Sequence, residues 1–207
     1  MKAEQNKWLD WAIELQALAQ TGLEYSKDVY DIDRFNRMRE ISAEIISEYT
    51  HLNFDVVTDL FCNESGFQTP KLDSRAAIIK ENKILLVKEN NQKWSLPGGW
   101  VDVNESVKTN IIKEVKEESG FHAVPLKIIA VLDRNKHNSP RYAYGICKIF
   151  VLCEVDDSPF VSNHETLERG FFTLDDLPEL ALEKNSVEQI QMCFKAYQDK
   201  NWQTIFD

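Results

Sequence analysis

The sequence is poor in cysteine, and its cysteines are not arranged to bind zinc. There are four, Cys62, Cys147, Cys153 and Cys193, and none forms a C-x-x-C pair. That pair is the usual spacing of a structural zinc site. Cys147 and Cys153 fall on one expected strand, too far apart along it to bridge each other. We therefore expect free thiols and a reducing compartment.

Long apolar runs are also absent. No stretch approaches the ~18 consecutive apolar residues that a membrane span requires. The first residues, MKAEQNKWLDWAIELQ, are interrupted by charges and lack the apolar core of a signal peptide. These absences predict a cytoplasmic protein that does not associate with membranes.

Positive charge is scarce. The 207 residues include 24 Lys and Arg against 34 Asp and Glu, which gives a net charge of −10. This balance disfavours binding to duplex nucleic acid, although local basic positions can still bind one phosphate group. The chain is not poor in apolar residues, which make up 43% of it. It can build one large domain or a medium domain with a small extra one.

Residues 1–66 are predicted to form a small helical domain. Apolar residues recur at helical spacing from Trp8 and again from Val29, and a short third helix is expected from Phe54 to Cys62. The pair Thr21-Gly22 is expected to interrupt or end the first helix. These stripes carry no catalytic chemistry, so dimerisation or an active-site cover is predicted. The alternative is a simple covering layer for the chain's own sheet.

Residues 67–207 change to an α+β pattern after a Gly-, Pro- and Ser-containing linker at 63–74. Two helices are expected, at 104–119 and 186–199. The segments with strand character lie at 75–80, 84–88, 126–132, 144–155 and 170–173, and the first two flank the turn Glu81-Asn82-Lys83.

The stretch 99-GWVDVNESVKTNIIKEVKEESGF-121 concentrates carboxylates on an expected helix that begins at Asn104 as N-cap and ends at Gly120. With about 100° per residue, Glu114 and Glu118 fall within about 20° of Val107, at the edge of the apolar face. Glu117 lies on the flank. A purely solvated glutamate would be expected on the opposite side of the helix.

Three negative charges in about one turn repel one another and need compensation. A hard divalent cation supplies it, since magnesium takes a few carboxylate ligands and keeps several waters. An ordinary Glu/Lys-rich surface helix is the alternative. The preceding 94-WSLPGGW-100 favours a ligand site, because glycines let the backbone approach a ligand closely.

The stretch resembles the Nudix box, the motif of the Nudix hydrolases. All 23 positions have the box spacing: Gly99, five residues, Glu105, seven residues, Lys113-Glu114-Val115, one residue, Glu117-Glu118, one residue, Gly120-Phe121. One residue departs, since the family has arginine where this chain has Lys113. The flanking segments RAAIIKENKILLVKE and ETLERGFFTLDDLPEL extend the resemblance to about residues 72–200.

The resemblance implies a Nudix α/β/α sandwich with a mixed sheet, preceded by the helical domain. It also implies an Mg2+ cofactor, with Mn2+ as a possible substitute. The implied metal ligands are Glu114 and Glu118, with Glu117 as a further ligand and the Gly98 carbonyl as a backbone ligand. The implied structural residues of the box are Gly99, Glu105, Lys113 and Gly120. Lys113 provides a point charge without the planar fork of the arginine that it replaces.

The general base often comes from outside the box in this family. Glu168 is the first candidate and Glu165 the second, and for each the alternative is an exposed loop carboxylate. Glu117 is a further candidate, acting through a metal-bound water. Predicted substrate contacts are Arg75, Arg134, Trp100 and Tyr142, and the alternatives are surface or packing roles.

The resemblance implies an enzyme that cleaves a small nucleoside diphosphate linked to a group X. The chain is similar to a Nudix subgroup that includes CDP-choline and ADP-ribose pyrophosphatases. CDP-choline, giving CMP and phosphocholine, is the favoured substrate, and ADP-ribose is next. The alternatives are a hydrolase of RNA 5′ ends or an exonuclease, and a catalytically silent ligand-sensing module. A homodimer is expected.

Overall fold

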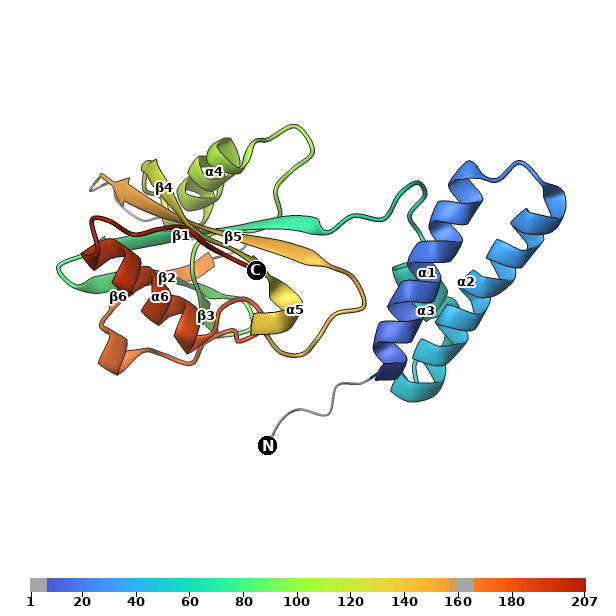
Figure 1. Cartoon of the computed structure of the whole chain (residues 1–207). Helices are drawn as coiled ribbons and strands as arrows, with labels where there is room; N and C mark the ends of the chain where they lie inside the picture. Colours follow the sequence, from blue (N-terminus) through green and yellow to red (C-terminus); the bar gives the residue numbers. More distant parts are fainter. Residues whose placement is uncertain (1–6, 157, 159–165) are drawn as a thin grey trace. The chain divides into compact units, whose positions relative to one another are not determined.

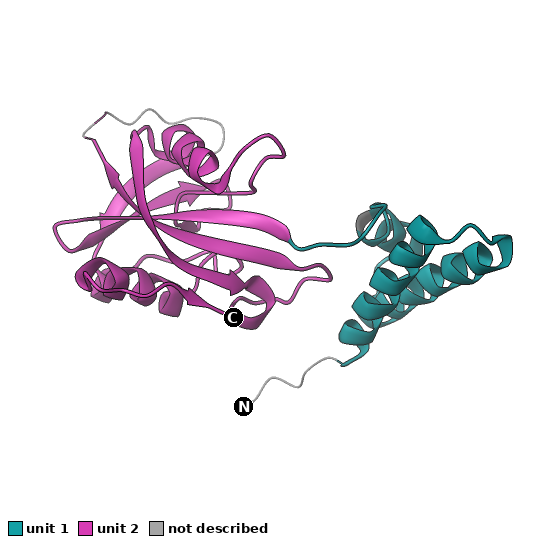
Figure 2. Ribbon diagram, turned by 45° about the horizontal axis from the view of Figure 1, so that its top comes forward, with its two compact units in different colours: residues 1–70 teal, residues 71–207 magenta. Residues whose placement is uncertain are grey.

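The structure is a computed structural model that describes residues 7–156, 158 and 166–207. The chain divides into two compact units, Met1–Pro70 and Lys71–Asp207 (Figure 2). The boundary expected after residue 66 falls in the segment between the last helix of the first unit and the first strand of the second. No helix in the described ranges is long and apolar enough to cross a membrane.

The first unit is helical, as predicted (Figure 1). Its helices are α1 (Lys7–Tyr25), α2 (Val29–Thr50) and α3 (Phe54–Phe61). Asp28 caps α2 by accepting hydrogen bonds from two backbone N–H groups, and Asn53 caps α3 by accepting one, from the Asp55 N–H. A three-residue connection joins α1 to α2, so the two helices run side by side in opposite directions (Figure 1).

The expected helix end at Thr21-Gly22 is wrong, because α1 continues to Tyr25. The Thr21 hydroxyl donates to the Ala17 carbonyl at 2.8 Å, a local bond that is compatible with a helix. Gly22 lies against the Phe35 ring of α2, where a Cβ atom would overlap that ring. This glycine therefore allows two helices to approach closely, and it does not mark a terminus.

One face of α1 exposes large apolar side chains at intervals of seven residues. Trp11, Leu18 and Tyr25 are 59%, 53% and 69% exposed. A spacing of seven residues keeps side chains on nearly the same side of a helix. We call Trp11, Leu18 and Tyr25 the α1 stripe.

The second unit is built on a mixed seven-stranded sheet with the order β3-β2-β1-β5-β4-β7, in which β6 also pairs with β2. Its central strand β1 pairs in parallel with β5 and antiparallel with β2. The strands are β1 (Lys71–Lys80), β2 (Lys83–Glu89), β3 (Trp94–Ser95), β4 (Ala123–Asp133), β5 (Ile146–Val155), β6 (Thr166–Phe172) and β7 (Ile205–Phe206).

Helices cover both faces of this sheet, α4 (Val107–Ser119) on one and α6 (Val187–Gln198) on the other (Figure 1). Side chains alternate along β1, so Ala76 and Ile78 pack with α4 while Ala77 and Ile79 pack with α6. The predicted α+β class and the three-layer α/β/α sandwich are confirmed. Short elements that the sequence analysis did not predict are β3, β7, α5 (Arg134–His137) and the 3-10 turn Leu174–Asp176.

The β1–β2 hairpin turns where the sequence predicts it. Glu81 and Asn82 have φ values of 49° and 57°, as a two-residue hairpin loop with both residues left-handed requires. The other predicted strands are confirmed with shifted ends. The sequence analysis placed the start of this strand at Arg75, and that prediction is wrong. β1 begins at Lys71, so Arg75 lies in the middle of the strand.

Candidate active site

The Pro-Gly-Gly segment runs antiparallel along the first half of β1. The Ala76 N–H donates to the Pro97 carbonyl at 2.8 Å, and the Ser74 N–H donates to the Gly99 carbonyl at 2.9 Å. This pairing presses Gly98 onto Ser74, where a Cβ atom would overlap the Ser74 carbonyl oxygen. Gly98 also has a φ of 134°, which side chains rarely permit. The glycine is therefore required by the backbone at this position.

Helix α4 follows this segment, and its N-cap differs from the prediction. Asn104 was expected to cap the helix, but Ser106 does so through a reciprocal capping box with Thr109. The reason is local, since the Ser106 hydroxyl accepts the Thr109 N–H and the Thr109 hydroxyl accepts the Ser106 N–H. The predicted C-terminus is confirmed: Gly120 has a φ of 76° and its N–H donates to the Lys116 carbonyl.

Glu114 and Glu118 lie one turn apart on α4, both half-buried beside the Gly98-Gly99 segment. The Gly98 N–H donates to Glu118 Oε2 at 2.7 Å. Burial raises the pKa of Glu118 to about 8, and the Arg75 charge and the Gly98 bond oppose this rise. Burial also raises the pKa of Glu114, against the opposing effect of Lys113. Both carboxylates occupy sites where a nearby positive charge would stabilise the ionised form.

Lys113 connects the loop before α4 to the carboxylates on it. Its Nζ lies 2.5 Å from Asp102 Oδ2 and 3.3 Å from Glu114 Oε1. The hydrogen bond to Asp102 is the main cause that raises the pKa of Lys113 above its usual value. A single ammonium thus contacts two carboxylates, which is the arrangement an orienting cation needs.

The two remaining glutamates of the box, Glu117 and Glu105, differ in exposure. Glu117 is exposed on the flank of α4, as the helical wheel predicts. Glu105 is half-buried in the turn before Ser106, and its N–H donates to the Asp102 carbonyl at 2.9 Å. Their roles in catalysis and in box structure stay predictions.

A buried charge network lies behind Glu118. Arg75 is 5% exposed, and its Nε and Nη2 donate to the two Asp73 carboxylate oxygens at 3.1 and 2.8 Å. Burial acts to lower the pKa of Arg75, but the charge and hydrogen bonds of Asp73 outweigh it and leave this pKa raised. The Lys148 Nζ, on β5, lies 3.5 Å from Asp73 Oδ2. Asp73 therefore holds two buried cations at the base of the site.

Residues 133–142 contain the short helix α5, whose first residue Arg134 is 1% exposed. Its guanidinium donates to the carbonyls of Pro140 and Glu183 and lies 3.6 Å from the centroid of the Tyr142 ring. Burial lowers the pKa of Arg134. Arg134 is thus held in place by protein groups.

These groups converge on one cavity of about 190 Å³. It is lined by the carboxylates Glu114 and Glu118 and by the cationic side chains Arg75, Arg134, Lys148 and Lys184. The structure thereby brings together most of the predicted site residues, and Gly98, Gly99, Trp100 and Tyr142 also line this cavity. We call it the charged cavity.

One predicted general base, Glu168, is not brought there. Glu168 lies on β6, with Oε2 3.9 Å from the Lys88 Nζ, and it is not among the residues that line the charged cavity. Glu165 lies outside the described residues. The identity of the base stays a prediction.

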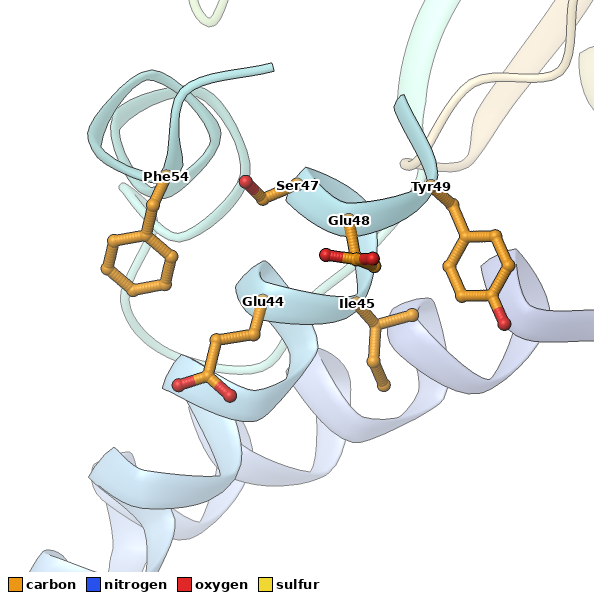
Figure 3. A pocket seen from close by; sticks show the side chains of 6 residues that line it. All are labelled: Glu44, Ile45, Ser47, Glu48, Tyr49 and Phe54. Atoms are coloured by element: carbon orange, nitrogen blue, oxygen red, sulfur yellow. The ribbon is translucent and has the colours of Figure 1, made fainter. Parts of the chain in front are cut away.

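A larger cavity, of about 660 Å³, lies in the helical unit between the end of α2 and Phe54 of α3 (Figure 3). Its six described lining residues include Glu44 and Glu48 and no basic residue. Two carboxylates without a cation in the lining do not suit a phosphorylated ligand. Size alone therefore does not identify the active site.

Sequence reasoning missed Asp73, Lys148, Lys184 and Glu89. The Lys184 Nζ lies 2.5 Å from Glu89 Oε2, and the Ser95 hydroxyl donates to Glu89 Oε1 at 2.6 Å. The sequence does contain one indication of a buried charge, because Lys148 lies inside the largely apolar run ICKIFVLCEV. An ionisable residue in such a strand is rarely buried without a partner.

The donor set suits a hard divalent cation. Within the described residues, no three His, Cys, Asp or Glu side chains already form a metal cluster. Magnesium needs only one or two protein carboxylates, because waters and substrate phosphates complete its shell. Glu114 and Glu118 line the same cavity, and their carboxylates have the oxygen chemistry that such a site requires.

The fold and this site define a Nudix hydrolase, and comparison with known families agrees. Residues 70–193 match the NUDIX domain, and residues 6–61 match the "UDP-X-like, N-terminal oligomerisation domain". The chain belongs to the Nudix family, whose members hydrolyse phosphorus-containing acid anhydrides and generally use divalent cations.

Two similar proteins match nearly the whole chain, and a third matches about two thirds of it. "Putative ADP-ribose pyrophosphatase YjhB" of Bacillus subtilis (strain 168) is 42% identical over 98% of both chains. A crystal structure of a UDP-X diphosphatase, 30% identical, covers 96% of this chain and 98% of its own with a TM-score of 0.63. A crystal structure of an ADP-ribose pyrophosphatase from Streptococcus suis 89-1591 is 52% identical, with a TM-score of 0.64, over 67% of this chain and 100% of its own.

Proposed function

We propose that this protein hydrolyses the diphosphate of a small nucleoside diphosphate linked to a group X, with Mg2+ as cofactor and Mn2+ as a possible substitute. The observation that supports this best is the charged cavity, which is lined by two carboxylates, Glu114 and Glu118, and by four basic side chains. A substituted pyrophosphate is a dianion, so it needs both the metal and fixed cations. ADP-ribose and UDP-linked compounds are the first candidates, because similar proteins carry these names. CDP-choline, favoured by the sequence analysis, is the next candidate.

Each group has a distinct role in this proposal. When bound, the metal neutralises phosphate charge and lowers the pKa of a coordinated water. Glu114, Glu118 and the Gly98 carbonyl hold it, with Glu117 as a further ligand. The Gly98 N–H fixes one Glu118 oxygen, and Lys113 orients Glu114 from the other side.

The substrate is held by the cationic wall of the cavity. Lys184 lies at this wall, tied to Glu89. Arg75 contributes positive charge from within the network that Asp73 fixes. Proton removal from the attacking water is assigned to Glu168, Glu165 or Glu117, which remain the candidate bases.

The test is turnover of a substrate panel by the purified chain with Mg2+ or Mn2+. The panel contains ADP-ribose, a UDP-linked sugar, CDP-choline and a 5′-diphosphate RNA. We expect turnover of at least one small compound, and a loss of about a thousandfold in kcat/KM for Glu118→Gln, since metal-based stabilisation contributes several kcal/mol. Glu154→Gln, an exposed carboxylate on β5, is the matched control. A folded protein that hydrolyses none of the panel would overturn the proposal.

We further propose that the helical unit forms a homodimer through the α1 stripe. Its family match is described as an oligomerisation domain. Trp11, Leu18 and Tyr25 are exposed apolar side chains on one side of α1, of the kind that subunits bury against each other.

A further inference from the structure

A second cavity of the Nudix unit, of about 450 Å³, adjoins the charged cavity. It is lined by Lys71, Leu72, Trp100, Val101 and Tyr144, and Trp100 lines both cavities. A volume of this size is within the range of small-molecule sites, roughly 300–1,000 Å³. The charged cavity, at about 190 Å³, is below that range and is too small for a diphosphate together with its two substituents. Part of the substrate therefore needs space elsewhere.

Trp100 forms an aromatic wall with a fixed backbone and an accessible ring. Its backbone pairs with Asp73, and the next N–H, that of Val101, donates to the Leu72 carbonyl at 2.9 Å. The residue is nonetheless 48% exposed. An indole that is held rigidly at its backbone and open to solvent at its ring is suited to stack on a planar ligand.

Tyr144 provides the second aromatic group, and Tyr142 is less suited to do so. The Arg134 guanidinium covers one face of Tyr142 at 3.6 Å from the ring centroid. The Tyr142 and Tyr144 rings lie 5.5 Å apart and are tilted by 38°. Tyr144 lines the second cavity, while Tyr142 lines the charged one. The sequence analysis named Tyr142 as a stacking residue, and the position of the cavities favours Tyr144.

Lys71 adds one polar group to this cavity. Its Nζ lies 5.6 Å from the centroid of the Tyr144 ring, so the ammonium is at the aromatic wall. An ammonium donates hydrogen bonds and accepts none. Such a donor suits the carbonyl or ring-nitrogen acceptors of a nucleobase. The lining combines aromatic faces with a hydrogen-bond donor. This combination is expected where the ligand is a heterocycle, and not where it is only a second phosphate.

We propose that this second cavity binds the nucleobase of the substrate, stacked on Trp100 and Tyr144, while the diphosphate lies in the charged cavity. The assignment rests on the proposed function, since it divides one nucleotide between two adjoining cavities. Trp100 lines both cavities, so a base stacked on it would lie next to the diphosphate site.

The test separates the contribution of the base to binding from that of the phosphate. Binding of AMP, UMP and CMP to the full chain is measured by calorimetry and compared with binding of ribose 5-phosphate, which lacks a base. We expect Trp100→Leu and Tyr144→Leu each to weaken nucleoside monophosphate binding by about 5- to 100-fold, since one stacked base contributes on this scale. Ribose 5-phosphate binding should change by less than about twofold, and Trp100→Phe should recover most of the affinity. Tyr197→Leu, an exposed aromatic on α6 outside both cavities, is the control.

Kinetics distinguish this proposal from the proposed function. With a substrate that the enzyme hydrolyses, KM should rise in both variants while kcat changes by less than about threefold. Unchanged KM values, or equal weakening of ribose 5-phosphate and nucleotides, would overturn the base site and leave the hydrolase proposal intact. Nucleotide binding that depends on Trp100 and Tyr144, in a chain that hydrolyses nothing, would support the base site and overturn the hydrolase.

Discussion

The two units of this protein bury different kinds of polar groups. In the Nudix unit, the buried side chains include the ionisable residues Asp73, Arg75, Arg134 and Lys148. In the described part of the helical unit, the buried polar side chains are neutral: Gln16, Gln20 and Ser42. Burying an ion costs several kcal/mol unless it is paired, so a fold keeps such groups where they serve a purpose. Here they line the cavity proposed to bind a charged diphosphate.

The exposed surfaces show the converse difference. The helical unit is about half as long as the Nudix unit. Among the described residues it nonetheless carries six of the nine exposed large aromatic side chains: Trp11, Tyr25, Tyr30, Tyr49, Phe54 and Phe67. An apolar surface of this kind favours association with another protein surface. We therefore propose that the Nudix unit carries the catalytic site and that the helical unit carries the dimer interface. Each proposal can be tested.

The largest stability effect is expected from removing the shared anion of the buried network. Asp73→Asn leaves Arg75 and Lys148 buried without their carboxylate partner. We expect the free energy of unfolding to fall by about 3–5 kcal/mol, as when one partner of a buried ion pair is lost. Calorimetry with denaturant titration measures this change.

The matched control comes from the helical unit. Arg37 pairs with Glu44 at 2.8 Å, but both side chains are largely exposed. Arg37→Met should leave the unfolding transition nearly unchanged, because water already solvates both charges. Equal destabilisation by Asp73→Asn and Arg37→Met would contradict the difference between the units.

The sequence predicts some residues of this site and not others. The difference is whether a contact joins residues that are close in the sequence or far apart in it. The positions of Glu114, Glu118 and Gly120 follow from the helical repeat, which is local. Asp73 and Lys148 meet because β1 pairs with β5 in parallel, with these two residues directly opposite each other. No local pattern specifies that pairing or its register. Gly22 was misjudged for a similar reason, since its contact, Phe35, lies on another helix.

A pH effect is expected from Lys148. Burial lowers its pKa to about 8, Asp73 opposes this change, and Arg75 and Arg134 add to it. Between pH 8 and the usual lysine pKa of 10.5, the unfolded chain holds a proton that the folded chain has released. The contribution of Lys148 to the free energy of unfolding therefore increases as pH rises through that window, by at most about 3 kcal/mol.

The measurement compares unfolding of the wild type and Lys148→Met at several pH values. Other groups titrate in both proteins, so the difference between the two curves isolates Lys148. We expect the wild type to gain stability relative to the variant between pH 8 and 10.5, and the difference to be constant below pH 7. Parallel curves over the whole range would show that the lysine titrates normally.

The assembly assignment is tested on the α1 stripe. The double variant Trp11→Glu, Leu18→Glu places two charges on the proposed interface. We expect the dimer dissociation constant to rise by at least about a hundredfold, because unpaired charges would be desolvated there. Light scattering across a concentration series measures the change. Val124→Glu, at an exposed apolar position of the Nudix unit, should remain dimeric. A wild-type chain that is monomeric at micromolar concentration would refute the dimer itself.

The smallest effect is expected at Lys113, the one departure from the box. Its ammonium reaches both Asp102 and Glu114, so it already supplies the charge that an arginine would bring. We expect Lys113→Met to lower kcat/KM by about tenfold and to weaken apparent Mg2+ affinity by a similar factor, as for other residues that orient metal ligands. Lys113→Arg should retain most of the activity, since a guanidinium can span the same two carboxylates. If Lys113→Met binds Mg2+ as tightly as the wild type, Lys113 does not orient Glu114, and the box carboxylates are held by Gly98 and by burial alone.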